Sequence, residues 1–334
     1  MNLNKRNYPP ESGIRLPAEK MERLIASLFM AVEMPQDDAE LMGRILTGND
    51  LRCVFSHGTQ ATSGYIEKIL AGDVNPQPQV KVMRESPGAL ALDGDGGLGY
   101  FPCYRGTLKA IEKARTCGVA ALTTYNHFHF GAAGNYSRLA LAHDCIGMSA
   151  SSHRSFLSPE SSIYGTLSSS PISVAIPAGE QPPLVMDMGS SFMGFSEQRF
   201  KEAPASLLKA MAFGNVVRVL GGVFAGIFRE EVQAPQSKWE SNQGSFIAVF
   251  DVNHFWPVDE MKREMDRFMA EARAAQPLPG LERAELAGGM EAIWERENVA
   301  QGIPVSDSHQ QRLQETADQM GVETPFAEYE DSRF

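Results

Sequence analysis

Residues 50–58 read Asp-Leu-Arg-Cys-Val-Phe-Ser-His-Gly, and they lie where a predicted helix ends and a loop begins. Apolar residues recur at helical spacing over 37–51, and the serine and glycine that follow favour a loop. The loop places His57 between a hydroxyl group and a glycine. An imidazole titrates near neutral pH and can donate or accept a proton, so His57 is a candidate general acid or base. A lone loop histidine more often only hydrogen-bonds to the backbone, so this role needs support from elsewhere in the chain.

The composition indicates a globular protein that does not bind nucleic acid. The chain has 334 residues, of which 43% are hydrophobic and 21% are charged, enough for one large core or two modest ones. The formal net charge is -11 at pH 7. Surfaces that bind nucleic acid concentrate Lys and Arg, so we expect no nucleic-acid partner.

The cysteines and the N-terminus indicate a cytosolic protein. The cysteines form no C-x-x-C pair, so they signal neither a zinc site nor a thioredoxin-like redox site. Residues 1–15 contain charges and prolines but no apolar signal region, and no stretch approaches ~20 uninterrupted apolar residues. We therefore expect no membrane association and small buried cysteines in a reducing compartment. These cysteines are Cys53, Cys103, Cys117 and Cys145.

The hydrophobic pattern changes between helical and strand periodicity along the chain. This pattern predicts helices at residues 17–32, 37–51, 64–70, 107–117, 136–143, 258–274 and 310–320, and strands at 80–84, 89–92, 119–125, 172–176, 184–188 and 246–250.

A glycine-rich run at residues 93–99 reads D-G-D-G-G-L-G and follows a predicted strand. A nucleotide-binding glycine loop holds a pyrophosphate at a helix N-terminus, and the charges of Asp93 and Asp95 would repel that group. A structural turn is therefore favoured, and no Rossmann fingerprint is assigned.

Polar side chains gather after the predicted strand at 119–125. Asn126, His127 and His129 enter a loop there, and sites are often built where a buried strand ends. Two histidines at positions i and i+2 on a loop, without a nearby carboxylate, are a poor set of metal ligands. We therefore expect no metal site.

Four blocks of sequence carry a resemblance to a known family. The pattern D-L-R-x-x-x-S-H-G at residues 50–58, followed by Tyr65, Ala71-Gly72 and Asn75-Pro76, resembles the N-terminal signature of the malate/L-lactate dehydrogenase superfamily. In the family's order follow blocks that resemble D-G-D-x-G-x-G at 93–99, N-x-x-H-F-G-A-A-G-x-Y at 126–136 and v-x-D-M-A-T-S at 185–191. This superfamily is unrelated to the Rossmann-type dehydrogenases.

The resemblance implies an α/β fold with a large, mostly antiparallel mixed sheet flanked by helices, in place of a doubly wound parallel sheet. The N- and C-terminal helices would pack together. Residues 1–85 and 255–334 would form a helical domain, and residues 86–254 a sheet domain that carries the cofactor site. The resemblance also implies a homodimer.

The resemblance implies hydride transfer between NAD or NADP and a small 2-oxo or 2-hydroxy acid, or a cyclic imine. His57 would be the proton donor, and Ser56 and Asp187 would orient or polarise its imidazole. The residues implied to bind the substrate are Gln60, Thr62 and His129. Those implied to bind the cofactor are His129, Lys209, Asp187, Met188, Gly189, Ser190, Gly289 and Glu291.

The chain departs from the family's pattern at several points. The family's loop continues S-H-G-V-x-R, with an arginine suited to a substrate carboxylate, but Ala61 stands at that position. Residues 165–171 replace G-T-N-P, and the long excursion that follows v-x-D-M-A-T-S is missing. Ala210 and Ala212 replace the glycines of K-G-x-G after Lys209. These departures leave open a lyase, isomerase or hydratase that uses His57, or a non-catalytic relative.

Overall fold

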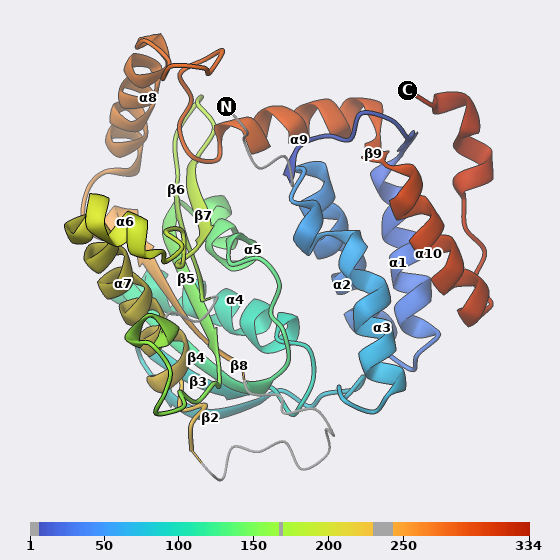
Figure 1. Cartoon of the computed structure of the whole chain (residues 1–334), viewed down its shortest axis with the longest axis horizontal. Helices are drawn as coiled ribbons and strands as arrows, with labels where there is room; N and C mark the ends of the chain where they lie inside the picture. Colours follow the sequence, from blue (N-terminus) through green and yellow to red (C-terminus); the bar gives the residue numbers. More distant parts are fainter. Residues whose placement is uncertain (1–6, 167–169, 230–242) are drawn as a thin grey trace. The chain divides into compact units, whose positions relative to one another are not determined.

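The computed structural model describes residues 7–166, 170–229 and 243–334 of a chain that forms two compact units (Figure 1). The helical unit comprises Met1–Gln77, Pro277–Glu285 and Gly289–Phe334. The sheet unit comprises Pro78–Gln276 and Leu286–Gly288.

The boundaries of these units differ from those expected, because residues 78–85 and 255–276, together with the short segment 286–288, belong to the sheet unit. Strand β2, Lys81–Ser86, pairs with β3, Ala89–Asp93, over its whole length. Helix α8, Val258–Ala274, carries Asp266, whose carboxylate accepts hydrogen bonds from three backbone N–H groups of the turn at 179–181. Both segments are therefore tied to the sheet.

The sheet unit is built on one seven-stranded sheet in the order β2-β3-β4-β8-β5-β6-β7. Among the described strands, only β3 and β4 pair in parallel, and the other neighbours pair antiparallel. The predicted mostly antiparallel mixed sheet is thereby confirmed. The remaining strands are β4 Val119–His127, β5 Cys145–His153, β6 Pro171–Ile176, β7 Leu184–Gly189 and β8 Gln243–Asp251.

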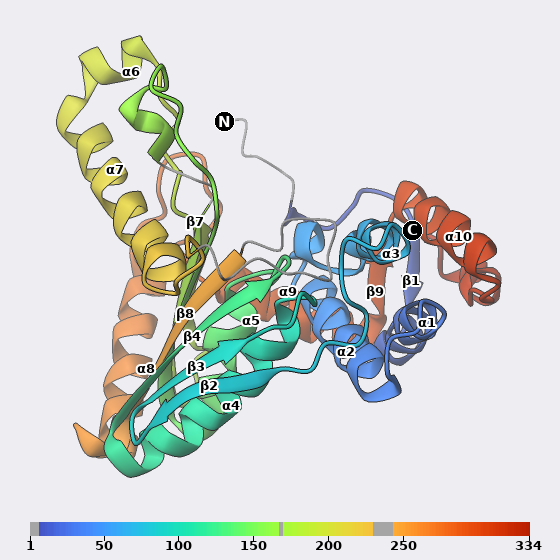
Figure 2. The same cartoon turned by 90° about the horizontal axis from the view of Figure 1, so that it is seen from below.

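Helices cover both faces of this sheet (Figure 2). On one face α4, Tyr100–Cys117, packs Ala110, Ile111 and Ala114 against buried side chains of β3, β4 and β8. On the other face, Phe213 and Val217 of α7, Pro204–Arg218, pack on side chains of β5, β6 and β7. These are Met148, Ala150, Ile172, Met186 and Met188. Shorter elements are α5 Gly134–Ser137, α6 Glu197–Glu202, η4 Arg138–His143, η5 Ile163–Thr166, η6 Val219–Val223 and η7 Val252–His254.

Two predicted helices differ from those observed. Helix α4 begins at Tyr100 instead of residue 107, because Pro102 lies in the first turn, where its missing N–H costs no hydrogen bond. The helix expected at 136–143 is the single turn α5, followed by the 3-10 segment η4.

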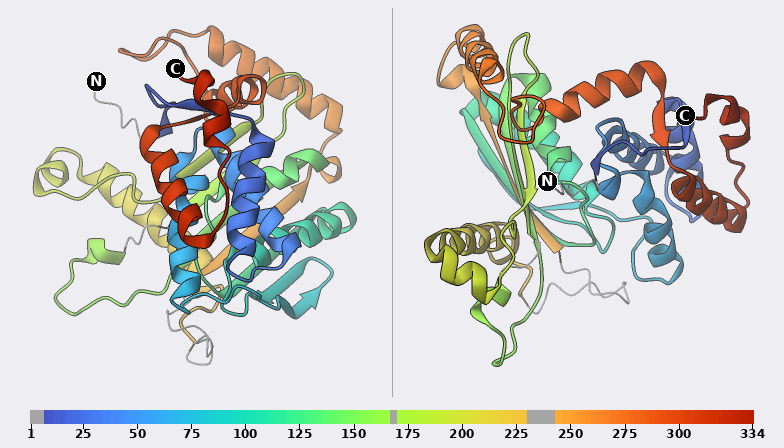
Figure 3. Two further views of the ribbon diagram at one scale, coloured as in Figure 1. Left: turned by 90° about the vertical axis from the view of Figure 1, so that its right-hand side faces the viewer. Right: turned by 45° about the horizontal axis from the view of Figure 1, so that its top comes forward.

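The helical unit joins the two ends of the chain (Figure 3). Strand β1, Ile14–Leu16, pairs antiparallel with β9, Ile303–Val305, and Phe334 N donates to Gly13 O. The N- and C-terminal helices pack together, as predicted. They are α1 Ala18–Met30, α2 Gln36–Leu51, α3 Thr62–Leu70, α9 Gly289–Gln301, α10 Asp307–Met320 and η8 Phe326–Ser332.

Candidate active site

The loop that carries His57 consists of two short 3-10 turns between α2 and α3. The turns are η2 Phe55–His57 and η3 Thr59–Ala61. Within the first turn, Ser56 Oγ lies 3.0 Å from His57 Nδ1, and both side chains are partly exposed. A hydroxyl at this distance hydrogen-bonds to one ring nitrogen and thereby orients the imidazole.

The backbone of His57 is held by the last turn of α2. The buried Asn49 donates from Nδ2 to His57 O at 2.8 Å. Arg52 in turn donates to Asn49 Oδ1 at 3.1 Å and pairs with Glu295 of α9 at 2.9 Å. These contacts hold the side-chain amide of Asn49 in place, and Asn49 in turn holds the backbone of His57.

Asp50 holds the other side of the loop. Its fully buried carboxylate accepts from Thr59 N, at 3.2 Å to Oδ1 and 3.3 Å to Oδ2, and from the Thr59 hydroxyl. A Cβ atom on Gly58 would overlap Asp50 Oδ1, so only glycine fits between His57 and Thr59. Burial raises the pKa of Asp50 to about 7, against the opposing effect of the two kinds of hydrogen bond from Thr59.

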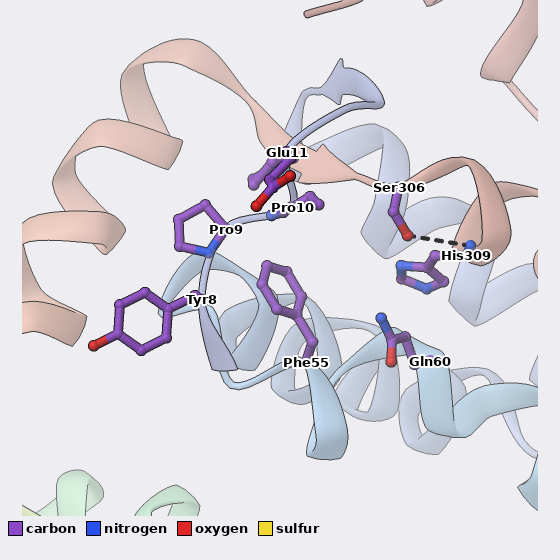
Figure 4. Close-up of a pocket in the computed structure, with 9 residues that line it drawn as sticks. Tyr8, Pro9, Pro10, Glu11, Phe55, Gln60, Ser306 and His309 are labelled. Atoms are coloured by element: carbon purple, nitrogen blue, oxygen red, sulfur yellow. Dashed lines mark hydrogen bonds between the residues drawn. The ribbon is translucent and has the colours of Figure 1, made fainter. Parts of the chain in front are cut away.

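A cavity of about 380 Å³ lies beside this loop in the helical unit (Figure 4). Phe55 and Gln60 line it from the loop, and Ser306, the N-cap of α10, and His309 in α10 line it from the other side. None of the described residues that line the cavity is Lys or Arg. Its lining therefore supplies no cation in place of the arginine that the family's pattern has at the position of Ala61. The other lining residues are Tyr8, Pro9, Pro10, Glu11 and Pro304.

Gln60 and Thr62, both predicted to bind substrate, have different surroundings. Gln60 is exposed and faces the cavity. Thr62 is fully buried in the first turn of α3, and its hydroxyl has no hydrogen-bond partner among the described residues. The structure therefore brings Gln60, but not Thr62, to an accessible surface.

Asp187 lies on β7 in the sheet unit, where its Oδ2 accepts from Gly134 N at 2.9 Å. A Cβ atom on Gly134 would stand 2.6 Å from that oxygen, so the close approach requires glycine. Met188 and Gly189 complete the strand. The block resembling v-x-D-M-A-T-S and the glycine of the block resembling G-A-A-G therefore meet, although they are separated by about fifty positions of sequence.

Ser190 continues a row of serines at the ends of three strands. Ser190 N donates to Ser170 O at 2.8 Å, and Ser170 Oγ donates to Ser152 Oγ at 2.9 Å. The Ser190 hydroxyl is buried without a hydrogen-bond partner among the described residues, and so are both amide atoms of Asn135 in α5. Buried polar atoms normally have partners, and the described residues supply none for these groups.

The two neighbouring histidines have different surroundings, and His127 is the last residue of β4. His127 is fully buried, with Nε2 2.8 Å from Thr124 Oγ1 and Nδ1 2.7 Å from Phe128 O. Burial lowers its pKa to about 4, so it is a neutral packing residue. His129 is partly exposed, and its backbone oxygen accepts from Gly99 N at 3.1 Å.

The glycine-rich turn supports this loop. Asp93 Oδ1 accepts from Asn126 Nδ2 at 2.7 Å, which agrees with the structural role expected for the turn. Within the described parts of the chain, no group of three or more His, Cys, Asp or Glu side chains is arranged to hold a metal ion.

The remaining predicted cofactor residues lie on helices of both units. Lys209 is exposed on α7, next to the buried Ala210. Gly289 and Glu291 lie in the first turn of α9, in the helical unit.

Sequence reasoning did not single out Asp50, Asn49, Thr59 or His309. Asp50 is the first residue of the D-L-R-x-x-x-S-H-G signature, and its place in that signature was a usable signal. His309 lies 250 positions from Thr59 and carried no signal in the sequence.

The sequence profile described as "Malate/L-lactate dehydrogenase" matches residues 16–200 and 197–314. The chain belongs to this family. The two matched segments meet at residues 197–200, where the sequence indicates that the family's excursion is missing.

Relatives and solved structures agree with this assignment. The malate dehydrogenase of Pyrococcus horikoshii is 28% identical, over 96% of this chain and 99% of that protein, and its solved structure superposes with a TM-score of 0.83 over 95% and 98% of the two chains. The L-sulfolactate dehydrogenase of Methanocaldococcus jannaschii is 26% identical over 80% and 86%. The Δ1-piperideine-2-carboxylate reductase of Pseudomonas syringae shares the fold, with a TM-score of 0.71 and 18% identity over 91% and 99%. The family and these names indicate a dehydrogenase.

Proposed function

We propose that this chain is an NAD- or NADP-dependent oxidoreductase that acts on a small 2-oxo or 2-hydroxy acid, with His57 as the proton donor. The observation that carries the proposal is the imidazole of His57, which contacts Ser56 Oγ through Nδ1 on a loop anchored by Asn49 and Asp50. A proton donor must be held in one orientation to serve a reacting atom, and this loop supplies such an orientation.

Each residue of the loop is proposed to have a different role. Ser56 engages Nδ1, so proton transfer is assigned to Nε2 of His57. In the reductive direction His57 gives its proton to the substrate oxygen, or to the nitrogen of an imine, and in the oxidative direction it takes that proton back. Gln60, exposed beside the loop, contributes neutral hydrogen bonds to the substrate. Thr62 supports the turn from within α3. His129 of the sheet unit is proposed as a further substrate contact.

The residues of the sheet unit fit a polar dinucleotide. The orphaned Ser190 hydroxyl and Asn135 amide are buried groups that a bound ligand can satisfy, and Lys209 supplies an exposed cation. The nicotinamide group, when bound, supplies or accepts the hydride. The residues proposed to bind the cofactor as a whole are Asp187, Met188, Gly189, Ser190, His129, Lys209, Gly289 and Glu291.

The names of the relatives narrow the substrate. They act on malate, sulfolactate and lactate, and one neighbour of the same fold is named for reducing a cyclic imine that carries a carboxylate. The proposed substrate is therefore a small carboxylic acid with a carbonyl, hydroxyl or imine group next to the carboxylate. Ala61 removes the arginine that the family's pattern provides for that carboxylate.

A second candidate keeps His57 but lacks hydride transfer. Ala61, the missing excursion, and Ala210 in place of a glycine favour a lyase, isomerase or hydratase, or a non-catalytic relative. A side chain in place of glycine closes a backbone approach to a ligand. Nucleotide binding discriminates between the two candidates.

The assembly is proposed to be a homodimer. An apolar stripe is exposed along α7 and η6, at Leu208, Val216, Val219 and Val223, each about half exposed. Patches of this kind mark protein contacts. The segment Pro204–Val223 is, by length and composition, apolar enough to cross a membrane. This is weak evidence for a membrane span, because core helices of soluble proteins share that property.

The protein is proposed to be cytosolic. All four cysteines are free, as is usual in a reducing compartment.

The experiment follows nucleotide oxidation by absorbance. The purified protein is mixed with NADH or NADPH and, in turn, with the 2-oxo acids of malate, sulfolactate and lactate, and with Δ1-piperideine-2-carboxylate. Turnover of one of them that falls ~10²–10⁴-fold in His57→Asn supports the proposal. Nucleotide binding without turnover of any 2-oxo acid or imine would reject the proposed substrate class.

A further inference from the structure

Three buried side chains of the helical unit form a continuous chain of hydrogen bonds. The Thr59 hydroxyl contacts the Asp50 carboxylate and lies 3.0 Å from His309 Nε2. Asp50 and Thr59 are fully buried, and His309 is 4% exposed. The chain connects the end of α2, through the His57 loop, to α10.

The family pattern S-H-G-V-x-R has valine where Thr59 stands, and valine offers no hydroxyl to either neighbour. The loop is therefore joined to α10 by polar contacts at a position where the family's pattern has an apolar side chain.

The direction of the hydrogen bonds depends on the charge of Asp50. An ionised carboxylate only accepts, so the Thr59 hydroxyl donates to it and accepts from a proton on His309 Nε2. A protonated Asp50 donates to Thr59 Oγ1, whose hydroxyl then donates to His309 Nε2, and the imidazole carries its proton on Nδ1. The two contacts of the chain are kept in both states, and the tautomer of His309 reports which state is present.

The same carboxylate supports the residues that follow His57. It receives Thr59 N–H and lies against Gly58, while its neighbour Asn49 holds His57 O. A change in the charge or position of Asp50 therefore acts on the two residues that follow His57.

We propose that Asp50, Thr59 and His309 form a buried relay that positions His57, an inference that rests on the proposed role of His57 as proton donor. All three are positioning residues, because none is assigned a contact with substrate or cofactor. The pocket-lining face of His309 makes the cavity of Figure 4 the outer end of the relay.

The charge states support the relay. Burial raises the pKa of Asp50 to about 7, so its carboxyl changes charge in the neutral range. Burial lowers the pKa of His309 to about 4, so its imidazole stays neutral there. The other groups whose charges act on or near the relay are Cys53, whose pKa burial raises to about 12, Arg15 and Glu297 beside that thiol, and Arg312 on α10.

The test is histidine-selective NMR between pH 5.5 and 8.5 of the wild type, of two variants that assign resonances and of three variants that probe the relay. The chain has seven histidines, and His57→Asn and His309→Gln identify the two resonances. Thr59→Val removes the hydroxyl group, whereas Thr59→Ser keeps a hydroxyl group at the same position. Ser63→Ala is the matched control, because Ser63 Oγ lies 2.7 Å from Thr316 Oγ1 and is a second buried hydroxyl link to α10 that does not touch the His57 loop.

In the wild type and in Thr59→Ser, we expect the His309 tautomer to change near pH 7 and the His57 resonance to show an inflection at the same pH. Both signals are lost in Thr59→Val and kept in Ser63→Ala. Identical His57 titrations in the wild type and Thr59→Val would overturn the relay. The measurement needs neither substrate nor nucleotide, so its outcome is separate from that of the proposed function.

Discussion

The carboxylate of Asp50 lies against Gly58, and a Cβ atom at Gly58 would overlap Asp50 Oδ1. Gly58→Ala is therefore expected to destabilise the fold by about 1–3 kcal/mol, the range for overpacking a tight site, and to reduce turnover. Chemical unfolding measures the first effect. Gly64→Ala in α3 is the control, because a Cβ there meets no atom within 4 Å and a helical alanine is favoured over glycine by about 1 kcal/mol. Equal stability of the two variants would contradict this account of the loop.

Loss of the imidazole tests the proton donor. We expect His57→Asn to keep the thermal midpoint of the wild type, because the side chain is partly exposed, and to lose ~10²–10⁴-fold in turnover. Ser56→Ala should lose less, since it removes only the contact to Nδ1. A thermal midpoint that falls with the activity would return His57 to a structural role.

The buried His309 makes stability depend on pH in the acid range. Its folded pKa of about 4 lies below the ordinary value of 6.5, so the unfolded chain binds the proton first as the pH falls. The contribution of the neutral His309 to the free energy of unfolding is complete above pH 6.5. It is lost as the pH falls toward 4, and the free energy of unfolding then falls by at most about 1.4 kcal/mol per pH unit.

Urea unfolding at several pH values between 7 and 4 measures this effect. The advantage of the wild type over His309→Gln should shrink as the pH falls. The exposed His143→Gln serves as the control and should run parallel to the wild type. A constant difference between wild type and His309→Gln would show that His309 does not titrate as described.

The stripe on α7 predicts the oligomeric state. Val219 is 49% exposed, and Val219→Glu should convert a dimer to a monomer in light scattering at micromolar concentration, because a charge at an apolar contact is desolvated. Val299→Glu, at a 67% exposed valine of α9, should leave the dimer intact. A wild-type monomer would refute the proposed interface.

The order of motifs in the sequence was sufficient to predict the family and the mixed, mostly antiparallel sheet. Local patterns also placed His57 in a loop after a helix, because the spacing of apolar residues ends at Leu51. They missed the start of α4, since the glycine and proline around Tyr100 are typical of a turn.

The surroundings of the site depended on contacts that no local pattern records. Thr59 and His309 are 250 positions apart, and the orphaned Ser190 hydroxyl is defined only by the packing around it. The exposed Lys209 and the first turn of α9 were assigned by resemblance alone. Their role in cofactor binding stays a prediction.

The central claim is that this divergent chain still uses a nicotinamide cofactor. Calorimetric titration of the protein with NADH and with NADPH tests it most directly, and Ser190→Val serves as the variant because it fills the place of the unpartnered hydroxyl with a larger apolar group. The account predicts binding of at least one nucleotide in the micromolar range, about -8 kcal/mol, weakened in Ser190→Val. No detectable binding of either nucleotide by the folded wild-type protein would contradict it.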